Sequence, residues 1–197
     1  MQDSKPVKTP LPPSCRMPTD STENFDNPGL YRRVLGALQY ATVTRPDIAY
    51  SINKLCQFMH KPLEFHWKCV KRLLLYLSGT KDQGLLFQKS PSLPITGFAD
   101  SDWAADRTDM RSTTGYCVYL GKNLVSWMAK KQHTVSRSST EAEFRSLAAT
   151  VSEITWIQPL LTELHAKHTE PPLIWCDNLG VVLLTTNPVV SSVLCRA

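Results

Sequence analysis

The sequence predicts an α/β chain in which a small helical bundle precedes a part built from short strands and one long helix. Apolar residues recur at three-four spacing from about Asn27 to Lys89, the spacing of one helical face. Near Ser90 this pattern changes to short alternating runs, and a single long helical pattern follows from Glu141. We therefore expect three antiparallel strands, a crossover helix and a parallel fourth strand in the second part.

Composition sets the outer bounds of the prediction. The 197 residues can hold one domain of ordinary size or two small ones. The net charge of +5 and a pI near 8.9 favour a polyanionic partner without proving one. Six cysteines without a C-x-x-C pair indicate reduced thiols. The chain shows neither a secretory signal nor an apolar run of membrane-spanning length, so we expect an intracellular protein that is not secreted and has no membrane partner.

Residues 1–26 are rich in proline, serine and threonine. Such a composition buries too little apolar surface to offset the entropy lost on ordering. We expect this segment to be a tail or linker.

Residues 27–89 are expected to form the helical bundle. One helix should cover Gly29–Val43, and the segment that follows it carries a start signal for the next helix. In that signal Thr44 can cap, Pro46 suits the first turn and Asp47 complements the helix dipole.

A third helix should begin at Pro62 and stop at Gly79. After it, Gly84–Lys89 reads as a short strand leaving the bundle. Basic residues on this bundle include Lys54, Lys68 and Lys71. They could form a surface that follows a nucleic-acid backbone, or they could be an ordinary solvated face over an aromatic core.

Residues 90–197 are expected to form the α/β part. The expected elements are strands at Leu93–Ala99, Gly115–Gly121 and Asn123–Met128, a long helix at Glu141–Leu164, a buried strand at Leu173–Cys176 and a short helix at Asn178–Thr185. Pro159 removes a backbone donor inside the long helix and should kink or split it.

Three acidic residues stand where one of these elements begins or ends. Asp100 ends the first strand, Glu143 lies at the head of the long helix, and Asp177 follows the fourth strand. Carboxylates delivered to one point by separate elements are suited to a hard cation such as Mg²⁺ or Mn²⁺. Two such ions can activate water and stabilise the leaving oxygen in phosphodiester cleavage.

Each acid also has a structural explanation. Asp100 could be one of several loop acids that form turns. Glu143 stands three residues after Thr140, which is the spacing of a capping box. Asp177 could be the N-cap of the short helix. From the residues alone, both interpretations stay open.

Several segments resemble, in order and spacing, the Pol polyprotein of copia-type retrotransposons. The segments that resemble its ribonuclease H region are Phe98–Ala104, Arg111–Tyr116, Ser126–Trp127, Lys130–Gln132, Ser138–Phe144 and Cys176–Asn178. The segments that resemble the stretch after its reverse-transcriptase palm are Tyr31–Tyr40, Thr44–Tyr50 and Lys71–Thr80. The resemblance runs from about Asn27 to Pro188.

The resemblance implies a thumb- or connection-like segment at 27–89 and a ribonuclease H-like domain at 90–197. It implies that Asp100, Glu143 and Asp177 are catalytic ligands of Mg²⁺ or Mn²⁺ in hydrolysis of the RNA strand of RNA-DNA hybrids. Glu143 is preferred to Glu141 because the family's catalytic glutamate precedes an aromatic or apolar residue, here Phe144. The implied partners are an RNA-DNA hybrid or other nucleic acid and an upstream reverse-transcriptase palm. The implied location is a cytoplasmic virus-like particle or the nucleus.

The end of the chain departs from the family pattern. After Pro188 that pattern expects a fifth strand and a last helix with another catalytic acid, whereas Val189–Ala197 contains no acid or histidine. We therefore expect an incomplete fold without the fifth strand and last helix, an exposed edge on the fourth strand, and weak or no cleavage. No palm is present, so no polymerase site is expected. The alternative is a non-catalytic transposon remnant or nucleic-acid-binding module.

Overall fold

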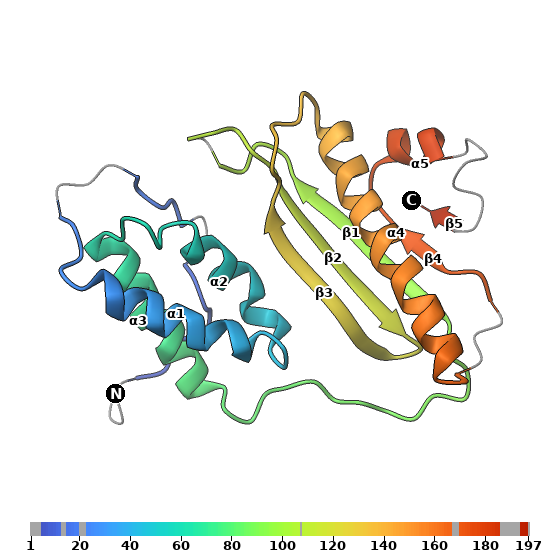
Figure 1. Ribbon diagram of the computed structural model, residues 1–197, viewed down its shortest axis with the longest axis horizontal. Helices are drawn as coiled ribbons and strands as arrows, with labels where there is room; N and C mark the ends of the chain where they lie inside the picture. Colours follow the sequence, from blue (N-terminus) through green and yellow to red (C-terminus); the bar gives the residue numbers. More distant parts are fainter. Residues whose placement is uncertain are drawn as a thin grey trace. The chain divides into compact units, whose positions relative to one another are not determined.

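The computed structural model describes residues 5–12, 15–19, 23–106, 108–166, 170–185 and 194–196. The chain divides into two compact units, Met1–Leu85 and Leu86–Ala197. The first unit contains α1 (Pro28–Ala41), the 3-10 turn η1 (Pro46–Ile48), α2 (Ala49–Cys56) and α3 (Glu64–Gly79) (Figure 1). The second contains β1 (Ile95–Asp102), β2 (Thr113–Leu120), β3 (Asn123–Lys131), α4 (Ser139–Glu163), β4 (Leu173–Trp175), α5 (Leu179–Thr185) and β5 (Leu194–Arg196).

The first unit is held by the apolar faces of its three α-helices. Tyr31 and Leu35 of α1, Leu55 of α2 and Leu73 of α3 are almost completely buried in one cluster. The Tyr31 hydroxyl donates to the Leu55 carbonyl at 2.9 Å, so the buried phenol is satisfied. The predicted helices are present, with bounds shifted by a few residues.

The predicted helix start is confirmed for Pro46 and Asp47, which lie in the first turn of η1, but the predicted cap at Thr44 is wrong. The Thr44 hydroxyl donates back to the Ala41 carbonyl of the preceding helix, and the chain enters α2 through η1. Arg45 in the same segment stabilises the turn before α2. It is only 7% exposed and donates to Asp47 at 2.9 and 2.8 Å. The same guanidinium donates to the Thr80 carbonyl and hydroxyl, each at 2.8 Å, which joins the end of α3 to this turn.

Residues 1–26 were expected to bury too little apolar surface to be ordered, and the described part of this segment differs from that expectation. Leu11 and Phe25 are buried against the helices, and Phe25 stacks on Trp67 with ring centroids 4.8 Å apart. Arg72 of α3 donates to the Thr9 hydroxyl at 2.8 Å. Prolines restrict the unfolded segment and so reduce the entropy lost when these few apolar side chains dock.

The aromatic side chains next to the basic residues of α3 make contacts within the first unit. Trp67 stacks on Phe25, and the Tyr76 hydroxyl donates to Asp47 at 2.8 Å. Lys68 and Lys71 are exposed. This arrangement favours the interpretation of a solvated face over an aromatic core.

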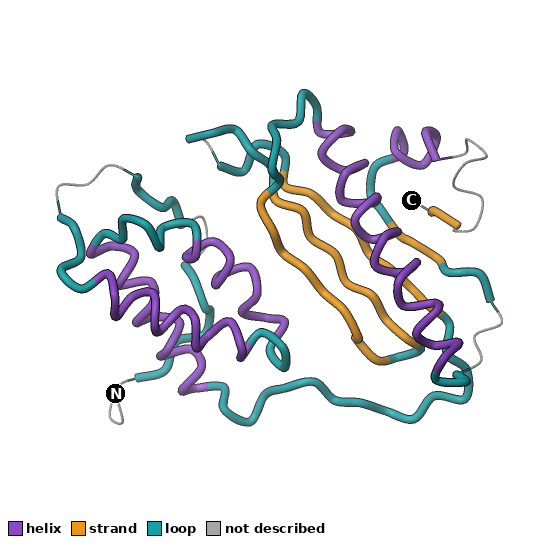
Figure 2. The backbone as a smooth tube through the Cα atoms, in the orientation of Figure 1, coloured by secondary structure: helices purple, strands orange, loops and turns teal. Residues whose placement is uncertain are grey.

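The second unit is built on one mixed sheet with the strand order β3-β2-β1-β4-β5. β1, β2 and β3 are antiparallel neighbours, whereas β4 runs parallel to β1. Helix α4 crosses one face of this sheet (Figures 1 and 2). The buried side chains between helix and sheet include Ile95, Val118, Leu147, Ile154 and Ile174.

The predicted strand at 84–89 and the predicted split of the long helix at Pro159 are wrong, whereas the kink expected at Pro159 stays a prediction. Residues 84–89 form no strand, although Gln88 exchanges two hydrogen bonds with the side chain of Asn123 at 2.7 and 2.9 Å. Helix α4 is not split at Pro159. Ile157 and Leu161 on either side are buried in the core, and their burial offsets the one hydrogen bond that proline removes.

The prediction that the fifth strand is missing is wrong as well. Leu194–Arg196 pairs in parallel with β4, with Leu173 opposite Leu194 and Trp175 opposite Arg196. An unpaired strand edge offers a row of backbone donors and acceptors, and a short extended segment can satisfy them. The edge of β4 that we expected to be exposed is therefore covered by this pairing. The prediction for the last helix is not tested by the described residues.

Candidate metal centre

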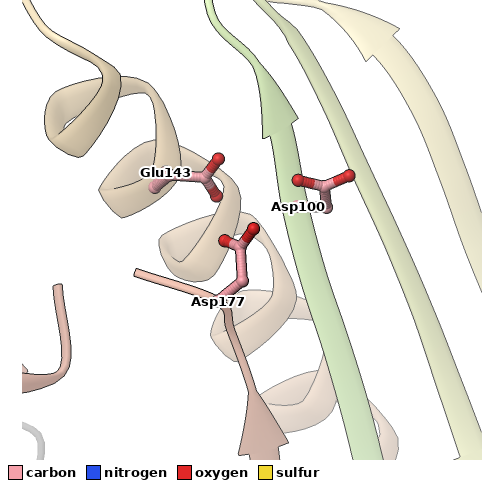
Figure 3. A group of neighbouring side chains, drawn as sticks. All are labelled: Asp100, Glu143 and Asp177. Carbon is pink, nitrogen blue, oxygen red and sulfur yellow. The ribbon is translucent and has the colours of Figure 1, made fainter. Parts of the chain in front are cut away.

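Three carboxylates from three different elements meet at one end of the sheet. Asp100 lies on β1, Glu143 in the second turn of α4, and Asp177 just after β4 (Figure 3). One oxygen atom from each lies within 4.8 Å of the others. The three residues selected from the sequence are thus brought together, and their role as metal ligands stays a prediction.

Strand register explains why Asp100 and Asp177 lie close together. In the parallel pair, Phe98 of β1 is opposite Trp175 of β4. Asp100 lies two residues after Phe98, and Asp177 lies two residues after Trp175. The two carboxylates therefore reach the same level on adjacent strands.

Helix α4 brings the third carboxylate to that point. The Ser146 hydroxyl contacts the Asp100 carbonyl at 2.6 Å and the Gly115 carbonyl at 3.0 Å. This contact fixes the helix, one turn after Glu143, against β1 and β2. Glu143 therefore faces the other two acids across a short gap.

The capping explanation of Glu143 does not hold. The N-cap of α4 is Ser138, whose hydroxyl accepts the Glu141 amide at 3.1 Å. Glu141 in turn accepts the Arg137 amide at 2.8 Å, and it pairs with Arg145 at 2.7 Å. The cap thus uses Ser138 and Glu141, which leaves Glu143 available for the site.

The structural explanations of the two aspartates fail in a similar way. Asn178 caps α5, since its Oδ1 accepts a backbone N–H of that helix at 3.2 Å. The turn-forming acids are Asp106 and Asp109, which accept nearby amides and pair with Lys131 at 2.6 and 2.8 Å. Asp177 does not cap this helix, and Asp100 lies within β1 rather than in that turn.

Glu143 lies in the most buried part of the site. It is 7% exposed, and its Oε1 accepts the Ser101 amide at 3.2 Å. Its Oε2 is buried without a hydrogen-bond partner among the described residues. Burial and the neighbouring carboxylates of Asp100 and Asp177 raise the pKa of Glu143 to about 7, against a lowering effect of the Ser101 amide.

These residues fit a hard divalent cation. All three offer carboxylate oxygens, and within the described part of the chain Glu143 Oε2 lacks the positive partner that a buried anionic oxygen requires. Asp100 and Asp177 are exposed, so the site is open to solvent on their side. Oxygens that share one Mg²⁺ lie roughly 3–4 Å apart, and the 4.8 Å spread needs only a small closure.

Sequence reasoning missed the polar residues that hold these acids in place. Ser101 supplies the amide to Glu143, and Ser146 fixes α4 to β1. Both serines are buried. The alternation along β1 could have indicated that Ser101 is buried, because it continues the inward-facing series of Ile95, Gly97 and Ala99.

The fold and the acidic cluster define the class: an α/β unit in which a mixed sheet and a crossing helix bring three carboxylates together at one end of the sheet. The sequence is 49% identical over 192 residues to the retrovirus-related Pol polyprotein from transposon RE1 of Arabidopsis thaliana, covering 98% of this chain. It is 47% identical over the same length to the polyprotein from transposon RE2 of that plant. The chain belongs to the family of retrovirus-related Pol polyproteins of copia-type retrotransposons.

The chain spans 13% of the length of each of these two polyproteins. No family model matches the sequence. Among solved structures, the foamy viral protease-reverse transcriptase in complex with dsDNA matches with a TM-score of 0.43 and 12% identity, covering 86% of this chain and 33% of that one. A likeness at that level does not establish a shared fold. Within the described part of the chain, no helix is both long and apolar enough to cross a membrane.

Proposed function

We propose that the second unit is a ribonuclease H-type domain that hydrolyses the RNA strand of RNA-DNA hybrids with Mg²⁺ or Mn²⁺. The observation that carries this proposal is the convergence of Asp100, Glu143 and Asp177, with one buried oxygen of Glu143 left unpaired. The chain's membership in the family of retrovirus-related Pol polyproteins supports the proposal.

In this proposal the three acids divide the work by their exposure. Glu143 is held from behind by the Ser101 amide and presents its free oxygen to the cation. Asp100 and Asp177 are exposed and would hold the cation on the solvent side, from which substrate would approach. A bound divalent cation supplies Lewis-acid activation of water and stabilises the charge that develops on the phosphate.

The proposed substrate follows from the chemistry of RNA. A hybrid duplex exposes 2′-hydroxyl groups in a wide, shallow minor groove, and these groups distinguish its RNA strand from DNA. The net charge of +5 favours association with such a polyanion. The open side of the acidic site would face the scissile phosphate.

We expect cleavage by this chain to be slow. Among the described residues, the cluster contains three carboxylates. Two divalent cations close together repel each other strongly. Three carboxylates carry enough negative charge to neutralise one such ion but not a pair of them, so the second ion should bind weakly. A second candidate function, nucleic-acid binding without cleavage, rests on this same charge count.

The test is cleavage of a 5′-labelled RNA strand within an RNA-DNA hybrid by the whole chain in Mg²⁺ or Mn²⁺. We expect slow cleavage of the hybrid and none of the same RNA when single-stranded. Glu143→Gln should abolish it. The matched control is Glu141→Gln, which removes a carboxylate two residues away that caps the same helix.

Equal cleavage by the two variants would contradict the proposed role of Glu143. Binding of the hybrid with no cleavage in either metal would favour the non-catalytic module. Rapid cleavage, lost in Glu143→Gln, would confirm the activity and refute the expectation that it is slow.

A further inference from the structure

We infer that Gln132 is the positioning residue of the carboxylate centre: it joins the residues adjacent to Asp100 and Glu143 and so sets the distance between these two acids. The inference rests on the proposed metal centre and adds to it a residue that touches neither metal nor substrate. It is carried by four hydrogen bonds made by one buried amide.

Gln132 follows β3 and its side chain enters the space between the sheet and the start of α4. It is 8% exposed, and its backbone amide is fixed by the Ser112 carbonyl at 2.8 Å. Its side-chain nitrogen donates to the Ala142 carbonyl at 3.1 Å and the Thr114 hydroxyl at 3.0 Å. The same nitrogen lies 3.4 Å from the Ser101 hydroxyl.

The residues that Gln132 contacts adjoin the site. Ala142 immediately precedes Glu143, and Ser101 immediately follows Asp100. Ser101 also donates its amide to Glu143 Oε1 at 3.2 Å. The Gln132 amide therefore holds the backbone next to Glu143 directly, through the Ala142 carbonyl, and the residue next to Asp100 through the Ser101 hydroxyl.

The orientation of the amide is itself determined by a partner. The Ser136 hydroxyl donates to Gln132 Oε1 at 2.9 Å, which leaves the nitrogen pointing towards Ala142, Thr114 and Ser101. Ser136 is buried, and its carbonyl accepts the Trp103 indole N–H at 3.2 Å. The loop before α4 is thus connected to β1, β2 and β3 through one side chain.

Through these contacts Gln132 positions two of the proposed metal ligands, so its removal should change metal affinity as well as stability. Groups that hold metal ligands in place typically change metal affinity by about 10- to 100-fold when they are removed. We expect removal of the Gln132 amide to weaken metal binding by a factor of that order, because Asp100 and Glu143 must both be held close enough to contact the same cation.

The test is Mn²⁺ binding by the whole chain, followed by the electron paramagnetic resonance signal of free Mn²⁺. Gln132→Met keeps the length of the side chain and removes its four hydrogen bonds. The matched control is Thr150→Val, which removes one buried hydroxyl that donates to the Ser146 carbonyl at 2.9 Å within α4. Binding is measured at a temperature at which circular dichroism shows both variants folded.

We expect Gln132→Met to weaken Mn²⁺ binding at least tenfold and Thr150→Val to change it less than twofold, although both lower the melting temperature. If Gln132→Met does not fold, Ser136→Ala provides the test. It removes only the bond that orients the amide, and it should weaken binding severalfold. Unchanged affinity in the folded Gln132 variant, or in Ser136→Ala where that variant replaces it, overturns the positioning role.

Asp100→Asn distinguishes this result from failure of the metal centre. If the wild type binds Mn²⁺ and Asp100→Asn does not, the centre stands whatever the Gln132 variant does. If the wild type and Asp100→Asn bind alike, the centre is wrong and the role of Gln132 fails with it. Cleavage is not the readout, so an inactive chain still gives an answer.

Discussion

A carboxyl group that is buried beside two other carboxylates favours its protonated form. At Glu143 this raises the pKa to about 7 from the usual 4.5. Proton and metal therefore compete for the same oxygen atoms, and the cation is favoured as pH rises. The repulsion among the acids also reduces the stability of the metal-free protein at neutral pH.

The first prediction concerns the pH dependence of that stability. Because the folded-state pKa of Glu143 is raised, its contribution to stability is fully present below pH 4.5 and is lost as pH rises through 7. In EDTA, the free energy of unfolding of the wild type should fall relative to Glu143→Gln between pH 5 and 8, by at most about 3 kcal/mol. Urea unfolding followed by circular dichroism measures it, and a difference that does not vary with pH would refute the assignment.

The three acids could be selected from the sequence, but their hydrogen-bond partners could not. Ser138, Ser139 and Thr140 are all able to cap α4, and the spacing from Thr140 to Glu143 left a capping box open as one explanation of Glu143. The structure uses Ser138 with Glu141 because the helix begins two residues earlier along the chain than that pairing requires. That start depends on where α4 lies on the sheet, which local spacing does not encode.

At the scale of elements, periodic patterns predicted the helices and most strands because burial on one face imposes a period. Isolated signals were less reliable. The run at 84–89 has strand-forming residues but no neighbouring strand to pair with, and Pro159 lies in a helix that the core holds on both sides. Pairing and packing partners that are distant in sequence decided both cases.

Two glycines provide a second prediction about packing between elements. At Gly97 on β1, an added Cβ would lie 3.0 Å from Thr150 and 3.1 Å from Ile154, both on α4. Gly97→Ala should push the helix from the sheet and lower the free energy of unfolding by about 1–3 kcal/mol.

Gly36 is the matched control for this substitution. It lies inside α1, and an added Cβ there meets no atom within 4 Å. Gly36→Ala should stabilise the first unit by up to about 1 kcal/mol, because alanine favours the helix. Urea unfolding gives both values, and a neutral or stabilising Gly97→Ala would show that α4 does not pack closely on β1.

At the scale of the whole molecule, the chain consists of two units, each with a hydrophobic cluster of its own. The segment between α3 and β1 contains Leu86 and Phe87, which are 76% and 65% exposed. Both are large apolar side chains, and the stretch around them forms neither helix nor strand. Such a segment suits a protease that cleaves after large apolar residues.

The third prediction is that chymotrypsin cuts first at Leu86 or Phe87 and leaves two resistant fragments. The reason is that cleavage there requires no unfolding of either hydrophobic cluster. Mass spectrometry of a short digest identifies the first site. A first cut within β2 at 115–120 or within α4 at 144–157 would contradict the division into two units.

If Asp100, Glu143 and Asp177 form one cation site, a divalent cation should stabilise the folded protein, and thermal unfolding measures this effect. A ligand that binds only the folded state adds about 2.7 kcal/mol at a concentration 100 times its dissociation constant. Mg²⁺ should therefore raise the melting temperature of the wild type by several degrees. The matched control is Asp109→Asn, which removes an aspartate that pairs with Lys131 and lies outside the cluster. Mg²⁺ should raise the melting temperature of the wild type and of Asp109→Asn but not that of Asp100→Asn. An equal rise in Asp100→Asn and the wild type would show that these three acids form no cation site.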